Sequence, residues 1–164
     1  MALLRRLRTY RFRAGTSGER GAELIEFAFV LPVLLLVAFG IIDFGFLFKE
    51  YEVVTNAARE GARLKSLGDS TGYSNADVQA RVLQYIINGG LDGSLLVTPV
   101  PVTATTIPVS ATDPTITASA YTVRVTYPHR FWFLAGIAQM FGGSFGTADL
   151  TATSTMRSEV QAAP

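Results

Sequence analysis

The acidic residue at the start of the longest apolar run is the first side chain whose spacing suggests chemistry. Glu26 stands five residues beyond Gly21 and directly before Phe27, where the run begins. A carboxylate at the edge of a membrane requires a partner, because its charge costs free energy where lipid replaces water. A cut after Gly21 would free the α-amine of Ala22, and Glu26 of one subunit could then pair with the amine of a neighbour. The alternative is a glutamate that only snorkels to the lipid headgroups.

The remaining ionisable groups give no pattern for catalysis. His129 is the single histidine, and the chain has no cysteine, so it lacks the companions for a zinc site or a catalytic triad. Gly142 and Gly143 precede neither a lysine nor a suitable helix start, so they do not form a phosphate-binding loop. We therefore expect no enzyme activity, no cofactor and no metal site.

The element that must hold Glu26 is the apolar run from Phe27 to Phe48, in which Asp43 is the only ionisable side chain. A helix of this length reaches roughly 33 Å, close to the roughly 30 Å of a bilayer's hydrocarbon core. The run is apolar on all sides, so lipid or other apolar helices must surround it. The excess of arginine before the run predicts that the N-terminus is cytoplasmic. These arginines are Arg5, Arg6, Arg8, Arg11, Arg13 and Arg20.

The run admits two other interpretations. A secretory signal peptide also has a basic start, an apolar stretch and small residues before a cut, here Ala38 and Gly40. The run continues well past Gly40, however, and Glu23 and Glu26 interrupt the region before it. The second alternative is a buried helix of a soluble protein, which is seldom so long and so apolar. A membrane span is therefore favoured.

Two residues inside the run are unusual for a membrane helix. Asp43 lies some five residues inside the outer end, where it can pair with a cation on a partner helix or snorkel to the interface. Pro32 has no N–H to donate, so it predicts a kink or local melting that neighbouring helices relieve. Proline is also more readily tolerated in membrane helices than in soluble ones, so Pro32 need not have a special role.

Helical periodicity continues beyond the run. It predicts that the first helix continues through Lys49 and ends at Leu67. Ser74 and Asp77 are expected to form the capping box of a second helix, which ends at Asn88. Gly89 and Gly90 supply the stop, and the expected buried stripe is Val78, Val82, Tyr85 and Ile86. The charged Arg59, Glu60 and Arg63 are expected on a solvated face, which is favoured, or in modest i,i+4 pairs.

From Ser94 the chain becomes rich in valine, threonine and proline. Extended segments are expected near 95–109, 115–127 and 147–157, and apolar residues alternate with polar ones over Tyr121–Tyr127. The predicted fold is therefore α+β and pilin-like, with a long N-terminal helix, a second helix and a short antiparallel sheet. The apolar segment Phe131–Phe141 is too short to span a membrane. It is interpreted either as a helix that caps the domain or as an aromatic patch that touches lipid headgroups or a neighbouring pilin, and core packing is favoured.

Several short motifs occur together along the first helix. They are Gly21, Glu26-Phe27, Leu31-Pro32, Gly40, Asp43-Phe44-Gly45 and the run Asn56-Ala57-Ala58-Arg59-Glu60-Gly61-Ala62-Arg63. The spacing of Gly21 and Glu26-Phe27 resembles the prepilin peptidase site of type IV pilin-like proteins of the tight-adherence (Flp-type) systems. The whole stretch from Gly21 to Arg63 resembles the TadE-like pseudopilin family.

This resemblance implies a substrate of an integral-membrane prepilin peptidase rather than an enzyme. Residues 1–21 would be a basic cytoplasmic leader cleaved after Gly21, residues 22–48 a transmembrane and assembly helix, and residues 49–164 an extracytoplasmic domain. The implied location is the bacterial inner membrane, with a single pass and a periplasmic or extracellular C-terminal domain, and incorporation into the pilus is a further possibility. Glu26, Pro32 and Asp43 would serve assembly.

The implied partners are membrane lipid, the prepilin peptidase, other pilins and the proteins of the pilus assembly platform. The implied role is that of a minor pilin or pseudopilin in assembly of a pilus for adhesion, biofilm formation or secretion. A single-pass envelope binding protein that never joins a pilus is the alternative. No nucleic acid is expected, because the chain beyond the arginine-rich leader is net acidic.

Overall fold

The computed structural model describes residues 17–67, 72–140, 142–144 and 146–159. These residues belong to two compact units, which divide between Ala38 and Phe39. The first unit is represented by the beginning of helix α1, and the second contains the rest of α1 and all other elements. Most of the expected leader, including its first five arginines, lies outside the described residues.

Helix α1 (Ser17–Ser66) contains the whole apolar run and its expected continuation. The helix passes through Pro32 without interruption, so the local melting considered for this proline does not occur. In the first unit, almost all side chains from Ala22 to Ala38 are exposed. Beyond the run the helix acquires a buried stripe of small residues, which are Val54, Ala57, Ala58, Gly61 and Ala62.

Helix α3 (Asn75–Asn88) begins and ends as the sequence predicts. Ser74 is its N-cap, and the reciprocal hydrogen bonds of a capping box join Ser74 and Asp77. At the other end Gly89 is the C-cap and Gly90 takes a φ of 78°, a conformation that favours glycine. Of the four residues expected in the buried stripe, Val78, Val82 and Ile86 are buried. Tyr85 is 36% exposed, so its assignment to the core was wrong.

The capping box makes the start of α3 sensitive to acid. Hydrogen bonds from the Ser74 side chain and backbone lower the pKa of the Asp77 carboxyl below its ordinary value of 3.8. Asp77 therefore stabilises the folded helix in full above the unfolded pKa, and this contribution is lost as pH falls from there through the folded pKa. We expect protection of the first-turn amides against hydrogen exchange to fall below pH 3.8. The variant Asp77→Asn should show no such fall, and an equal fall in that variant would contradict the assignment.

The sheet has three antiparallel strands in the order β1-β2-β3. Strand β1 (Val102–Pro108) pairs Val102 with Val123 of β2 (Thr117–Arg130), and β2 pairs Tyr127 with Leu150 of β3 (Thr147–Arg157). The first strand begins later than expected, because Pro99 and Pro101 lack the N–H that a strand ladder requires. A 3-10 turn, η1 (Gly93–Leu95), and a loop fill the difference.

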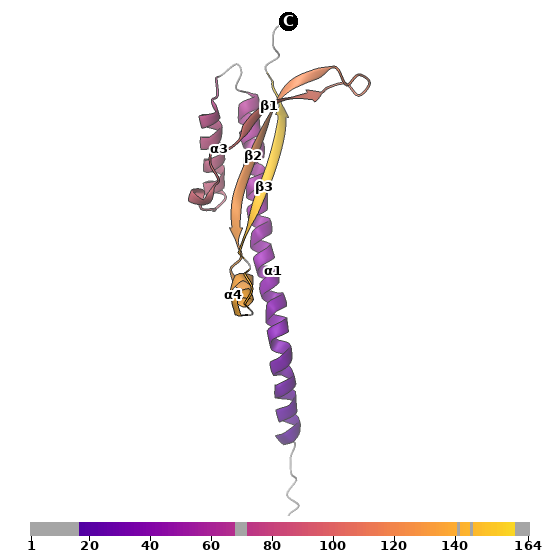
Figure 1. Cartoon of the computed structure of the whole chain (residues 1–164), viewed down its shortest axis with the longest axis vertical. Helices are drawn as coiled ribbons and strands as arrows, with labels where there is room; N and C mark the ends of the chain where they lie inside the picture. The colour runs from indigo at the N-terminus through magenta and orange to yellow at the C-terminus, as the bar shows by residue number, and fades with distance from the viewer. Residues whose placement is uncertain (1–16, 68–71, 141, 145, 160–164) are drawn as a thin grey trace, which may run out of the picture. The chain divides into compact units, whose positions relative to one another are not determined.

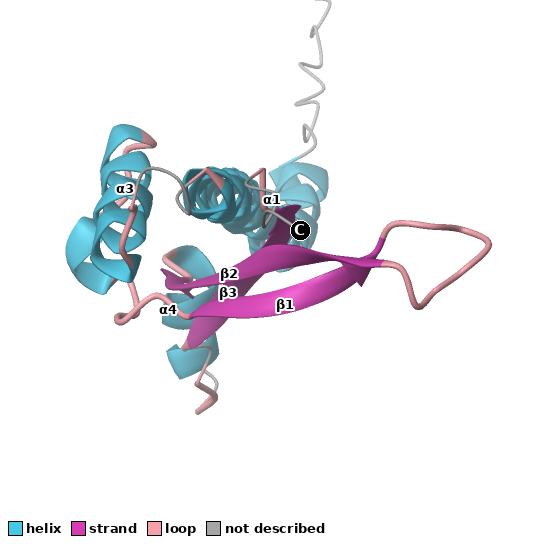
Figure 2. Ribbon diagram, turned by 90° about the horizontal axis from the view of Figure 1, so that it is seen from above, coloured by secondary structure: helices cyan, strands magenta, loops and turns pink. Residues whose placement is uncertain are grey.

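The core lies where α1, α3 and the sheet meet. Figures 1 and 2 show α3 and the sheet beside the C-terminal half of α1, with helix α4 (Phe133–Met140) between β2 and β3 in the chain. The principal core residues are Val54, Ala57, Ala58, Ala62, Val78, Val82, Ile86, Val123, Val125 and Tyr127. The inward-facing residues of β2 alternate with Thr122, Arg124 and Thr126, as expected for a strand with one buried face. The α+β fold class is confirmed.

Candidate membrane-anchoring and assembly site

The carboxylate of Asp43 caps the N-terminus of α4. The backbone N–H of Trp132 donates to Oδ1 at 3.2 Å, and that of Leu134 donates to Oδ2 at 2.8 Å. The N–H of Phe133 lies 3.3 Å from Oδ1 and 3.1 Å from Oδ2. Asp43 is completely buried by these contacts. The first N–H groups of a helix have no partner within it, and the helix dipole is positive at that end, so an anion satisfies both.

Aromatic rings reinforce this contact on both sides of Asp43. Phe39, one turn earlier on α1, stacks on Phe133 with ring centroids 4.7 Å apart and planes 5° from parallel. Phe44 meets Phe131 edge to face at 6.3 Å. Such pairs add to the stabilisation that apolar burial provides. The beginning of α4 is thus held to α1 by polar and apolar contacts together.

A second polar contact joins α1 to the end of β2. His129 is 1% exposed, and its Nδ1 lies 2.8 Å from Oε2 of Glu50. The ring nitrogen donates, because a carboxylate can only accept. Phe131 packs against the imidazole edge to face at 4.7 Å. His129 is therefore a buried, hydrogen-bonded histidine and not a surface residue.

These contacts share one face of α1. Phe39, Asp43 and Glu50 are spaced by four and seven residues, which places them along one side of a helix. The buried Val54 and Ala57 continue the same series toward the domain. The stripe that packs on the sheet therefore extends back into the apolar run, where it packs on α4.

Two expectations about this region require correction. Within the described residues, Asp43 does not snorkel and contacts no cation, because N–H groups of its own chain occupy the carboxylate. Core packing of the segment 131–141 was also wrong within the described residues: none of α4 is fully buried, and Trp132 is 78% exposed. No local sequence pattern indicates the Asp43 contact, because its donors are backbone N–H groups of residues 132–134, far along the chain.

The residues expected at the processing site lie in the first unit. Gly21 and Ala22 are within α1, and both Glu26 and Phe27 are exposed. The roles assigned to them, and the assembly roles of Pro32 and Asp43, remain predictions. Among the described residues, one helix is long enough and apolar enough to cross a membrane, and it is the part of α1 from Gly21 to Ser66. The most apolar stretch of this helix has no buried residue.

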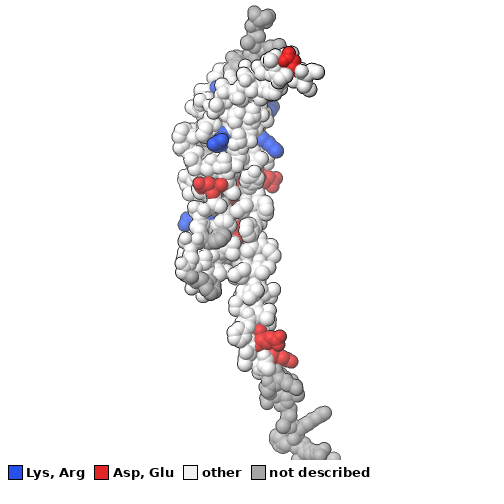
Figure 3. Space-filling view, turned by 45° about the vertical axis from the view of Figure 1, so that its right-hand side comes forward, with Lys and Arg blue, Asp and Glu red and all other residues white. Residues whose placement is uncertain are grey.

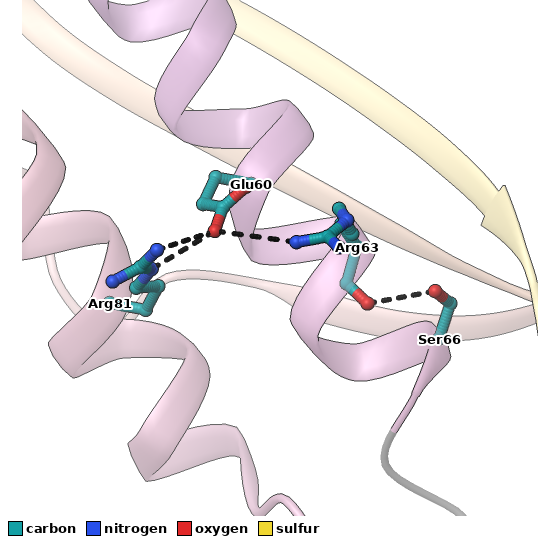
Figure 4. A network of polar contacts seen from close by, with 4 residues as sticks. All are labelled: Glu60, Arg63, Ser66 and Arg81. Carbon is teal, nitrogen blue, oxygen red and sulfur yellow. Dashed lines mark hydrogen bonds and ion pairs between the residues drawn. The ribbon is translucent and has the colours of Figure 1, made fainter.

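The end of α1 carries a small polar network, which is drawn in Figure 4. Glu60 Oε1 accepts hydrogen bonds from Arg81 of α3, with Nε at 3.1 Å and an Nη at 2.7 Å. Arg63 lies 3.9 Å from the same oxygen, and its carbonyl accepts from the hydroxyl of Ser66 at 2.8 Å. Glu60 was expected on a solvated face, but it joins the two helices instead.

Comparison with known proteins bears on this helix. Residues 21–63 match the family model described as TadE-like protein. Within this chain, that segment is TadE-like. The match confirms, for this segment, the resemblance seen in the sequence. No curated protein and no solved structure matched the chain.

The TadE-like segment includes both the expected cut and the helix surfaces that pack in the domain. It contains Asp43, which holds α4, and Gly61, whose close neighbours are Val78, Val82 and Val123. Within the described ranges, no three histidine, aspartate or glutamate side chains are grouped as metal ligands. The arrangement is suited to holding elements together and to packing against apolar surroundings.

Proposed function

We propose that this chain is a minor pilin or pseudopilin in assembly of a tight-adherence pilus that serves adhesion, biofilm formation or secretion. The observation that carries the proposal is the TadE-like match, because it begins at the glycine of the proposed cut and includes the acidic residue five positions later. The exposed apolar surface of α1 supports it, since such a surface requires lipid or other helices.

The proposed processing explains the charge pattern at the N-terminus. A prepilin peptidase on the cytoplasmic side removes residues 1–21, so the arginines no longer keep the helix end out of a bundle of apolar helices. Glu26 of one subunit then pairs with the Ala22 amine of the next, and this pair sets the axial offset between helices. Residues 22–48 cross the inner membrane, and residues 49–164 lie outside the cytoplasm.

N-terminal sequencing of the protein extracted from membranes tests the proposal. We expect a mature chain that begins at Ala22, and a chain with its leader intact when Gly21→Leu removes the residue before the cut. A natural chain that begins at Met1 would favour the second candidate, a single-pass envelope binding protein outside the pilus. A chain that begins at Ile41 would indicate a secretory signal peptide. Either result would overturn the pilin proposal.

The variant Glu26→Ala tests the pairing role separately from cleavage. We expect the leader still to be removed and co-purification with other pilus components to weaken. Loss of a pair of opposite charges at about 4 Å costs roughly 1 kcal/mol in water and roughly 4 kcal/mol near a protein surface, and each 1.4 kcal/mol is about tenfold in affinity.

Glu23 supplies a matched control for that experiment. It is a second exposed glutamate near the cut, three residues before Glu26 on the same helix. The variant Glu23→Ala should co-purify as the unmodified chain does. Equal weakening by both substitutions would show that bulk charge, and not a specific pair, governs association.

A further inference from the structure

Helix α4 presents a large apolar surface beside the membrane helix. Its sequence, FLAGIAQM, has no ionisable side chain. Trp132 directly before it is 78% exposed, Met140 is 83% exposed and Phe133 is 39% exposed. Side chains of this size are costly to leave in water, so three of them within nine residues favour an apolar environment.

The contact with Asp43 fixes the level of α4 along α1. Asp43 lies five residues before Phe48, where the apolar run ends, which is about 7.5 Å along a helix. Its oxygens lie 2.8 to 3.3 Å from the first amides of α4. When the run crosses a bilayer, the start of α4 must therefore lie below the level at which the span leaves the hydrocarbon.

The same contact makes that position tolerable for both partners. Lipid offers no water to hydrogen-bond the free N–H groups at a helix start, so burying them there costs free energy. An aspartate without a partner is costly in lipid for the same reason. In this chain the carboxylate accepts from three such N–H groups, and the positive end of the helix dipole faces its charge. Each group removes the penalty that the other would otherwise incur.

The residues around α4 also match the chemistry of a membrane interface. Tryptophan is enriched where hydrocarbon meets headgroups, and lysine and arginine extend to the headgroups nearby. Trp132 lies between the exposed Arg130 and α4, and Lys49 borders a hollow that Phe46, Leu91 and Trp132 also line. On the face drawn in Figure 3, charged side chains gather mainly on the domain beyond the run.

We propose that α4 is a second membrane contact, a short helix that inserts into the outer leaflet of the bilayer beside the span. The occupant of its exposed face is lipid. Helices that pack on one another in membranes favour small residues at the contact, whereas the largest exposed side chains here are Trp132 and Met140. This inference rests on the membrane anchoring in the proposed function, and it adds that the domain is held at a fixed height on the bilayer.

Trp132 is the only tryptophan of the chain, so its fluorescence reports on α4 without labelling. The test uses the full chain in phosphatidylcholine vesicles whose acyl chains carry bromine at a shallow or a deep position. We expect short-wavelength emission from Trp132, strong quenching by bromine with the shallow position more effective, and little quenching by acrylamide in the water.

Two relocated probes calibrate the measurement. In Trp132→Phe with Ile116→Trp, the probe occupies an exposed position between β1 and β2, and it should respond to acrylamide and not to bromine. In Trp132→Phe with Leu36→Trp, the probe lies near the middle of the run, and deep bromine should quench it most.

The outcomes separate this inference from the proposed anchor. If Leu36→Trp is quenched by bromine but native Trp132 behaves as the probe at position 116, the anchor stands and the inference fails. If Trp132 emits at short wavelength yet ignores bromine, a protein surface covers α4, and the inference also fails. If Leu36→Trp ignores bromine, the run does not span the bilayer, and both proposals fail.

Discussion

Asp43→Asn should free the start of α4 from α1 while the rest of the domain stays folded. Asparagine keeps one acceptor oxygen, but its NH2 group would face the backbone N–H donors of α4. The negative charge that faces the helix dipole is also lost. Removing hydrogen bonds to a buried charged group leaves the donors unsatisfied, at about 1.5 to 3 kcal/mol for each strong bond. We expect exchange of the α4 amides to accelerate about a hundredfold or more, since each 1.4 kcal/mol is about tenfold.

The control for this variant is Asp149→Asn, which makes the same chemical change at an exposed position of β3. It should leave exchange in α4 unchanged. Amides of α3 and β2 should exchange at the same rate in all three proteins, because the core does not include Asp43. If α4 keeps its protection in Asp43→Asn, the aromatic contacts of Phe39 and Phe44 would be sufficient, and the cap would not hold the helix.

Gly61→Val should destabilise the domain severely. A Cβ at this position would lie 2.8 Å from Cγ2 of Val82, 3.3 Å from Cγ1 of Val123 and 3.4 Å from Cγ1 of Val78. All three valines are fully buried and stiff at χ1, so they cannot move aside easily. Overpacking of a core costs typically 1 to 3 kcal/mol, and valine adds two methyl groups beyond the Cβ, so we expect about 3 kcal/mol or more. Thermal or denaturant unfolding measures the loss.

Two alanine variants distinguish overpacking from helix propensity. Glycine to alanine within a helix normally gains about 1 kcal/mol. Gly136→Ala in α4 should show that gain as slower hydrogen exchange of the α4 amides, because a Cβ there meets nothing within 4 Å. Gly61→Ala should instead lose stability, since its Cβ contact with Val82 outweighs the gain. An increase in stability for Gly61→Ala would show that the neighbouring valines relax readily.

Local sequence patterns were enough to predict the first two helices and the sheet. The capping box of Ser74 and Asp77 and the glycine pair after Asn88 determine where α3 begins and ends. Alternation along β2 indicated its buried face, because side chains of a strand point to opposite sides in turn. The extended segment expected near 95–109 becomes a strand only from Val102, because Pro99 and Pro101 lack the N–H that a strand ladder requires.

The partner of Asp43 could not be predicted in the same way. Its donors are backbone N–H groups of residues 132–134, which any sequence possesses, and they lie about ninety positions away along the chain. Helical periodicity also gives no contrast within a run that is apolar on every side, so the face of α1 that packs on α4 is hidden among equivalent residues. Glu60 and Arg81 present the same difficulty, because each looks like an ordinary surface charge.

In the proposed assembly, the position of α4 would decide how a neighbouring helix can approach α1 at the height of Asp43. The acidic side is closed, so an arriving helix cannot recognise this chain there by charge. The opposite side is different: Gly45 stands two residues from Asp43, about 200° around the helix, and has nothing within 4 Å of where a Cβ would be. Selection of a neighbour at that height must therefore depend on the fit of side chains into a shallow notch in the backbone.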